Sequence, residues 1–193
     1  MRSVLIASAG FALCALAPAV AGDYENWFAG KPGGVACYAR SYDAAHMASH
    51  ARQKVVEIEL DFDAKNAESE GNRPSRFVAG LGVRLKGKKG WYTNSLYCNE
   101  RALGGVDCSL EGDGGQLQLQ PSGEGLELRP QGEISIEGDD FISFGGKASD
   151  DNVFILKPAP QKVCDESTAE LRWGVLGRNG KRLALTGRAG RVV

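Results

Sequence analysis

The sequence predicts an all-β domain, an antiparallel meander of roughly 8 to 11 short strands that forms a barrel or a sandwich. Two observations support this. Apolar and polar residues alternate along 56–62 and 77–85, and a period of two is typical of half-buried strands. Beyond residue 110, apolar pairs at spacing two recur between Gly-containing turns, which is the pattern of a meander.

Residues 1–21 have the features of a secretory signal peptide. Arg2 precedes an apolar run over 4–16, and Ala19 and Ala21 form an A-x-A cleavage site. The run is too short to cross a bilayer stably. We therefore expect cleavage after Ala21, a periplasmic or secreted protein, and no transmembrane segment after cleavage.

The remaining residues, 22–193, fit one domain. We interpret 22–53 as an N-terminal arm that ends, over 42–53, in one short helix or a pair of turns, because 42–53 is free of Gly and Pro. The arm carries three aromatic residues that we expect to pack on the domain: Tyr24, Trp27 and Phe28.

The next two strands are expected over 55–63, with an acidic outer face, and over 77–85. A polar loop over 64–75 separates them, and the basic turn 86–89 leads from the second into a further strand. Five apolar pairs mark the later strands: Leu117 with Leu119, Leu126 with Leu128, Ile134 with Ile136, Ile142 with Phe144, and Phe154 with Leu156.

A closing hairpin is predicted for the last part of the chain. Its strands would place Leu171, Trp173 and Val175 opposite Leu183 and Leu185, across a turn containing Asn-Gly. A β-solenoid ranks second, because the spacings drift and no fixed-period motif recurs. An outer-membrane barrel is disfavoured, because most strands after residue 110 are shorter than the 9 to 11 residues it needs.

Four cysteines remain after cleavage, and an even number in an exported chain predicts two disulfides. Three connectivities are possible. We favour Cys98 with Cys108, which flank a short Gly-containing loop, and Cys37 with Cys164, which would link the two ends of the domain.

Three stretches resemble a group of uncharacterised exported proteins of Gram-negative bacteria. They are the run 37–50, the Asp-Cys pair at 107–108 before Gly-Asp-Gly-Gly at 112–115, and the run 150–156. The resemblance covers most of the chain after residue 21. It implies a small periplasmic β-rich domain, and it implies no activity, cofactor or assigned site.

The composition and motifs narrow the function. The formal charge of the chain is −1, with Lys and Arg scattered, whereas a nucleic-acid-binding domain needs a clustered basic face. No Gly-x-Ser-x-Gly elbow or other catalytic motif occurs. Enzymatic activity is uncertain, and the absence of a catalytic motif favours a non-enzyme.

A metal site is the most specific alternative. Asp43, His46 and His50 would share one face of a helix over 42–53, and imidazole nitrogens with a carboxylate can hold zinc or copper. The competing interpretation is that both histidines form local hydrogen bonds. Acidic loop residues could similarly bind calcium or serve as turn residues: Glu111, Asp113, Glu137, Asp139, Asp140, Asp150 and Asp151.

The first hypothesis for function is a disulfide-stabilised binding module that contacts a protein partner or a cell-envelope component without catalysis. Short turns on a β-scaffold present contact residues and need no catalytic set. The alternatives are a metal-binding protein or metal-dependent enzyme using Asp43, His46 and His50, and a small-molecule carrier with a barrel cavity. Trp91 and Tyr97 are candidates for the mouth of such a cavity.

Overall fold

The computed structural model describes residues 22–65, 72–136 and 141–174, and of 168–174 it describes the backbone only. Its β-strands in chain order are β1 (Val35–Ser41), β2 (Val55–Asp63), β3 (Phe77–Leu85), β4 (Tyr92–Glu100), β5 (Val106–Leu110), β6 (Gln116–Ser122), β7 (Gly125–Pro130), β8 (Glu133–Ile136), β9 (Ile142–Gly145) and β10 (Phe154–Pro158). The helices are α1 (Ala44–Ser49) and α2 (Gln161–Gly174), with the short helical turns η1 (Glu25–Ala29) and η2 (Pro32–Gly34). The predicted signal peptide, 1–21, lies outside the described residues.

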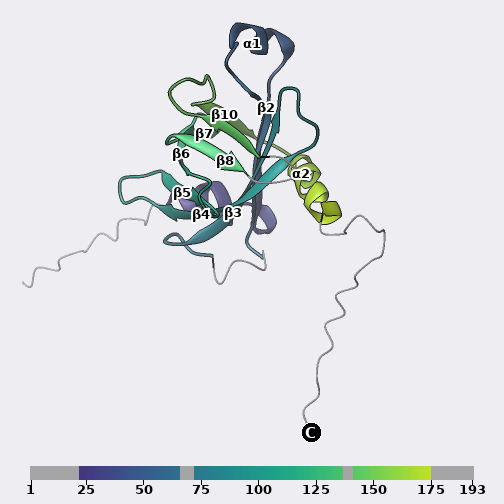
Figure 1. Cartoon of the computed structure of the whole chain (residues 1–193). Coiled ribbons are helices and arrows are strands. Elements are labelled where there is room, and N and C mark those ends of the chain that lie inside the picture. The colour runs from purple at the N-terminus through teal and green to yellow at the C-terminus, as the bar shows by residue number, and fades with distance from the viewer. Residues whose placement is uncertain (1–21, 66–71, 137–140, 175–193) are drawn as a thin grey trace, which may run out of the picture.

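Eight strands form a closed antiparallel barrel in the order β1-β10-β7-β6-β5-β4-β3-β2 (Figure 1). The all-β prediction is therefore confirmed, with a barrel as the architecture. All five apolar pairs lie on strands, β6 to β10. The meander has one interruption, because β8 and β9 pair only with each other and β10 joins β7 to β1.

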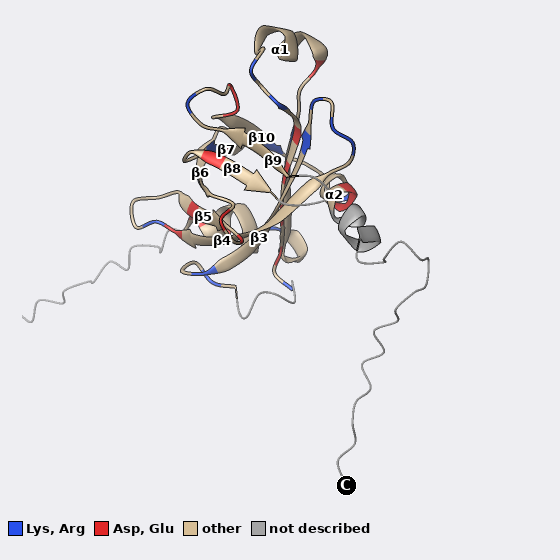
Figure 2. Cartoon of the chain, in the orientation of Figure 1, with Lys and Arg blue, Asp and Glu red and all other residues tan. Residues whose placement is uncertain are grey.

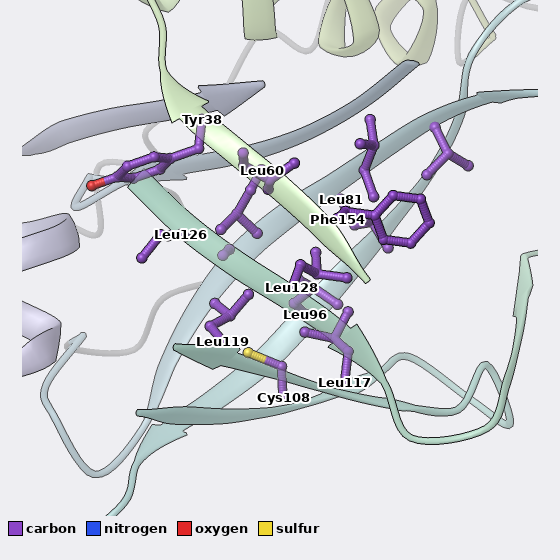
Figure 3. Close-up of a cluster of buried hydrophobic side chains, with 14 of the residues drawn as sticks. Tyr38, Leu60, Leu81, Leu96, Cys108, Leu117, Leu119, Leu126, Leu128 and Phe154 are labelled. Carbon is purple, nitrogen blue, oxygen red and sulfur yellow. The ribbon is translucent and has the colours of Figure 1, made fainter. Parts of the chain in front are cut away.

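The barrel encloses a single apolar core. Side chains at alternate strand positions point inward, and Figure 3 shows Leu60, Leu81 and Leu96 among the buried residues that fill the interior. A barrel of eight strands is just wide enough for side chains to fill it. The described inward-facing side chains therefore form one packed apolar cluster inside the barrel.

The N-terminal aromatic residues close one end of the barrel. Tyr24, Trp27 and Phe28 are buried, and the Phe28 ring centroid lies 5.3 Å from that of Phe62. The hydroxyl of Tyr38 donates a hydrogen bond of 2.9 Å to the Trp27 carbonyl. The prediction that these aromatics pack on the domain is confirmed.

The prediction that 22–53 is only an arm with a helical segment is wrong in one respect. Residues 35–41 form β1, a full barrel strand that pairs with β2 over its whole length. Its inward residues Ala36 and Tyr38 are buried. They do not stand out as a strand pattern, because Ala is small and Tyr is amphipathic.

The predicted strand at 171–175 is also wrong. Residues 161–174 form α2, so Leu171 and Trp173 lie within a helix, while 175–193 lie outside the described residues. The helix starts directly after Pro160, whose carbonyl accepts a hydrogen bond from Val163 N. Lys, Glu and Ala in this stretch favour a helix, and that propensity outweighs an alternation of three residues.

Both predicted disulfides form. Cys37 on β1 joins Cys164 on α2, across a sequence separation of 127 residues. Cys98 and Cys108 are direct partners on β4 and β5. The first bond fixes α2 to the outer face of the barrel, and the second lies within the core.

Candidate functional site

The predicted metal ligands lie at α1, where each one serves the local fold. Asp43 is the N-cap of α1, and its Oδ1 accepts a hydrogen bond of 2.8 Å from His46 N. An Asp side chain is among the preferred helix caps. The carboxylate is therefore already used by a backbone amide.

The two histidines interact with neighbours in the same segment. The rings of His46 and His50 stack with centroids 4.1 Å apart. Nε2 of His46 lies 2.9 Å from Gln53 Oε1, and Nδ1 of His50 lies 3.0 Å from the His46 carbonyl. No group of three or more His, Cys, Asp or Glu side chains in the described residues is arranged to hold a metal ion. The local hydrogen-bonding interpretation fits this geometry.

Asp150 and Asp151 act as turn residues. Asp151 is fully buried, and its carboxylate accepts hydrogen bonds from the backbone amides of Lys54 and Val55 and from the hydroxyl of Ser149. Asp150 forms an ion pair of 2.6 Å with Arg52. The bonds to Arg52, Lys54 and Val55 reach a distant segment and anchor the start of β2, which the local turn interpretation does not include. Glu137, Asp139 and Asp140 lie outside the described residues.

A groove of 960 Å³ lies on the outer surface of the barrel. Its floor is the outer face of β3 and β4, which includes Gly80, Gly82 and Thr93. Both α2 and β8 pack on β4, and α2 contributes Ser167 to the lining, while the hairpin β8–β9 and its connection contribute Ser135 and Phe141. We call this cavity the acidic groove.

The charged groups of the acidic groove are all carboxylates: Asp61, Asp63, Glu111 and Asp113. No Lys or Arg is among the described residues that line it. Figure 2 colours the acidic residues of β2 and α2 red. Apolar surface is also present, because Phe141 is 65% exposed and lines the groove. The groove thus offers negative charge next to an aromatic ring.

The turn between β5 and β6 holds two of these carboxylates at the edge of the groove. Glu111 N donates hydrogen bonds to the carbonyl of Ser95 and to Asn94 Oδ1 on β4. Ser135 N on β8 donates to the Gly114 carbonyl at 2.9 Å. The turn is therefore fixed from both sides, while the side chains of Glu111 and Asp113 are exposed.

The acidic face predicted for β2 is present, and α2 covers part of it. Glu57 pairs with Arg84 at 3.0 Å, whereas Glu59 is only 3% exposed. Burial raises the pKa of Glu59 to about 7, and the Ser167 side chain lowers it only in part. Oε2 of Glu59 has no hydrogen-bond partner among the described residues.

Asp61 is a second carboxyl group of β2 that contacts α2, and it also lines the groove. Gln161 Nε2 on α2 donates a hydrogen bond of 2.6 Å to Asp61 Oδ1. Burial still raises the pKa of Asp61, and the charge of Asp165 raises it further. Desolvation disfavours the charged form of a carboxyl group. The two carboxyl groups at the interface between β2 and α2 therefore hold their protons more tightly than a solvated carboxyl group does.

Gly82 permits α2 to approach the barrel. A Cβ at this position would lie 2.8 Å from Ser167 Cβ, which is closer than real Cβ contacts. At Gly80, the nearest atom would be Asp61 Cβ at an ordinary 3.7 Å. Glycine at position 82 thus sets how closely α2 packs beside the groove.

The two aromatic residues proposed for a barrel mouth belong to β4 and the residue before it, since Trp91 directly precedes the strand and Tyr97 lies within it. Tyr97 is an exposed residue of β4, and Trp91 has the Arg84 guanidinium 5.8 Å from its ring centroid. Neither residue lines the acidic groove.

Comparison of the chain with protein-family models, with curated proteins and with solved structures gives no match. Among the described residues, no helix combines the length and the apolarity that crossing a membrane requires. Because the comparisons suggest no function, the function is inferred from the residues that line the acidic groove.

Proposed function

We propose that this chain is an exported, non-catalytic binding module whose acidic groove binds a Lys- or Arg-rich segment of a protein partner. The observation that carries the proposal is the lining of the groove, with four carboxylates and no Lys or Arg among the described residues. The two disulfides support a location outside the cytoplasm, in the periplasm or secreted. The resemblance to exported proteins of Gram-negative bacteria agrees with this location.

The shape and chemistry of the groove fit a peptide segment. Its volume, 960 Å³, is in the upper range of typical ligand sites. Hydroxyl and amide groups on the floor offer hydrogen bonds, among them those of Thr93, Asn94 and Ser95. Phe141 offers an aromatic face, on which a Lys or Arg side chain gains cation–π energy.

A fluorescent peptide of four Lys-Ala repeats, with a Glu-Ala peptide as reference, tests the proposal by anisotropy. The groove variant is Glu111→Gln with Asp113→Asn, because both side chains are exposed on the turn. The control variant is Glu25→Gln with Glu124→Gln, which removes the same charge at exposed positions outside the groove.

We expect the Lys-Ala peptide to bind and the Glu-Ala peptide not to bind. The groove variant should weaken binding about five- to tenfold, because each exposed ion pair is worth about 0.2 to 1 kcal/mol. The control variant should bind like the parent. Equal weakening by both variants would mean that net charge alone attracts the peptide, and no binding at all would refute the proposal.

A further inference from the structure

We infer that the groove has an occupant within the same chain: the segment 175–193, which follows α2. This inference rests on the proposed function, since it requires that the groove binds a cationic peptide. The segment contains five basic residues and no acidic one: Arg178, Lys181, Arg182, Arg188 and Arg191. We call it the basic segment; it lies outside the described residues.

Charge complementarity is the first argument. The basic segment carries a charge of +5 from its side chains, whereas the groove is lined by carboxylates alone among its charged groups. The excess of acid continues behind the wall of the groove. Glu59, which is 3% exposed and leaves one carboxylate oxygen without a partner, is the direct strand neighbour of Gly82 on the floor.

The position of α2 is the second argument. Ser167, in the middle of α2, lines the groove, and the helix ends at Gly174. Seven residues of helix cover about 10 Å at 1.5 Å per residue. An extended chain covers about 3.3 Å per residue, so Lys181 can reach about 23 Å from the end of the helix. The basic segment is therefore long enough to turn back onto the groove.

The Cys37–Cys164 disulfide holds α2 beside the groove. It joins α2 to β1 one turn before Ser167, which lines the groove. A short connection between two binding groups gives an effective concentration of about 1 mM. If the segment binds with a dissociation constant of about 0.1 mM, the groove is occupied about ten times more often than it is free.

The consequence is competition between the basic segment and an external cationic peptide. Occupancy of the groove by the chain itself lowers the apparent affinity for a partner by the fraction of free groove. A partner must therefore displace the basic segment. Only a partner peptide with more cations, or with better placed ones, binds well.

Carbodiimide cross-linking of the full chain tests the contact. This reagent joins an amine to a carboxylate without a spacer, and Lys181 is the only lysine in the basic segment. We expect a cross-link from Lys181 to Glu111, Asp113, Asp61 or Asp63, identified by mass spectrometry of the monomer. Lys181→Arg keeps the charge and should abolish the cross-link. A mixture of light and isotope-labelled chains separates the cis contact from one between two copies, and cross-links found only between copies would overturn the inference.

Binding of the Lys-Ala peptide provides the second readout. We expect a variant with all five basic residues changed to Gln to bind the peptide about tenfold more tightly than the parent chain. Equal affinity of the variant and the parent would overturn the inference and leave the proposed function intact. Failure of both proteins to bind would instead refute the proposed function.

Discussion

Replacing Gly82 with Ala should push α2 away from the barrel. The new Cβ would lie 2.8 Å from Cβ and 3.0 Å from Oγ of Ser167, so the helix or the strand must move. The disulfide at Cys164, one turn earlier in α2, limits that movement. A clash in a well-packed interface costs about 1 to 3 kcal/mol.

A gain partly offsets this cost. Changing Gly to Ala at a compatible position stabilises a protein by about 0.4 to 1 kcal/mol, because the unfolded chain loses conformational freedom. We expect a net loss of about 1 to 2 kcal/mol for Gly82→Ala. The matched control is Gly80→Ala on the same strand face, where the new Cβ makes only an ordinary contact of 3.7 Å. The control should gain about 0.5 kcal/mol.

Urea unfolding followed by tryptophan fluorescence measures both changes. A double-mutant cycle with Ser167→Gly removes the clashing atoms and should recover most of the loss at position 82. The reasoning is refuted if Gly82→Ala is as stable as Gly80→Ala, because α2 would then not pack against Gly82.

Three further predictions concern the pH dependence, a buried carboxylate and the disulfides. Because the pKa of Glu59 is about 7 in the native protein and that of an unperturbed glutamate is 4.5, the native state binds this proton more tightly than the unfolded chain, and stability falls as pH rises from 4.5 to 7. The loss of unfolding free energy across this pH window is roughly 3 kcal/mol. Glu59→Gln should make the unfolding free energy nearly independent of pH there, and an unchanged slope would contradict this prediction. Asp151→Asn should lower the free energy of unfolding in urea by about 3 kcal/mol, because a buried carboxylate loses charged hydrogen bonds. The control, Asp150→Asn, should change stability little. Equal effects of the two variants would show that Asp151 does not anchor β2. Replacing both cysteines of Cys37–Cys164 by Ala should cost about 4.9 kcal/mol, against about 2.7 for Cys98–Cys108, because the loops close 127 and 10 residues; the reverse order would contradict the chain-entropy argument.

The strands can be predicted where the pattern is strong. Apolar residues occupy every second position of 77–85, with Val78 as one further apolar residue between them, and this stretch forms β3 with the same bounds. By contrast, β1 is not predicted, because Ala36 and Tyr38 do not form a clear apolar stripe, although Tyr38 is buried inside the barrel. A single-sequence pattern shows burial only when the buried side chains are large and apolar.

The candidate site cannot be predicted from the sequence, because it depends on how distant segments meet. The pattern does predict the acidic residues of β2 as an outer face, and Glu111 and Asp113 as turn residues. Their convergence on one groove depends on α2, for which the alternation of apolar residues predicts a strand hairpin instead. A signal for that helix is present in Pro160 and the helix-favouring residues that follow it.

For the proposed metal site, the sequence predicts the helix correctly but does not predict what the three side chains contact. The period of a helix predicts that Asp43, His46 and His50 share one helix face, and α1 does form there. The spacing does not determine what the side chains contact. In the structure the Asp43 carboxylate caps the helix, and the imidazoles stack on each other.

The most direct test of the account is a titration of the ¹⁵N-labelled protein, with both disulfides intact, with the Lys-Ala peptide, followed by NMR. Glycine amides occupy a distinctive spectral region, and the groove contains Gly80, Gly82, Gly112 and Gly114. The account predicts shifts of these four amides, with Gly123 at the β6–β7 turn unchanged. Shifts centred on Gly123, or on no defined surface, would contradict the claim that the acidic groove is the binding site.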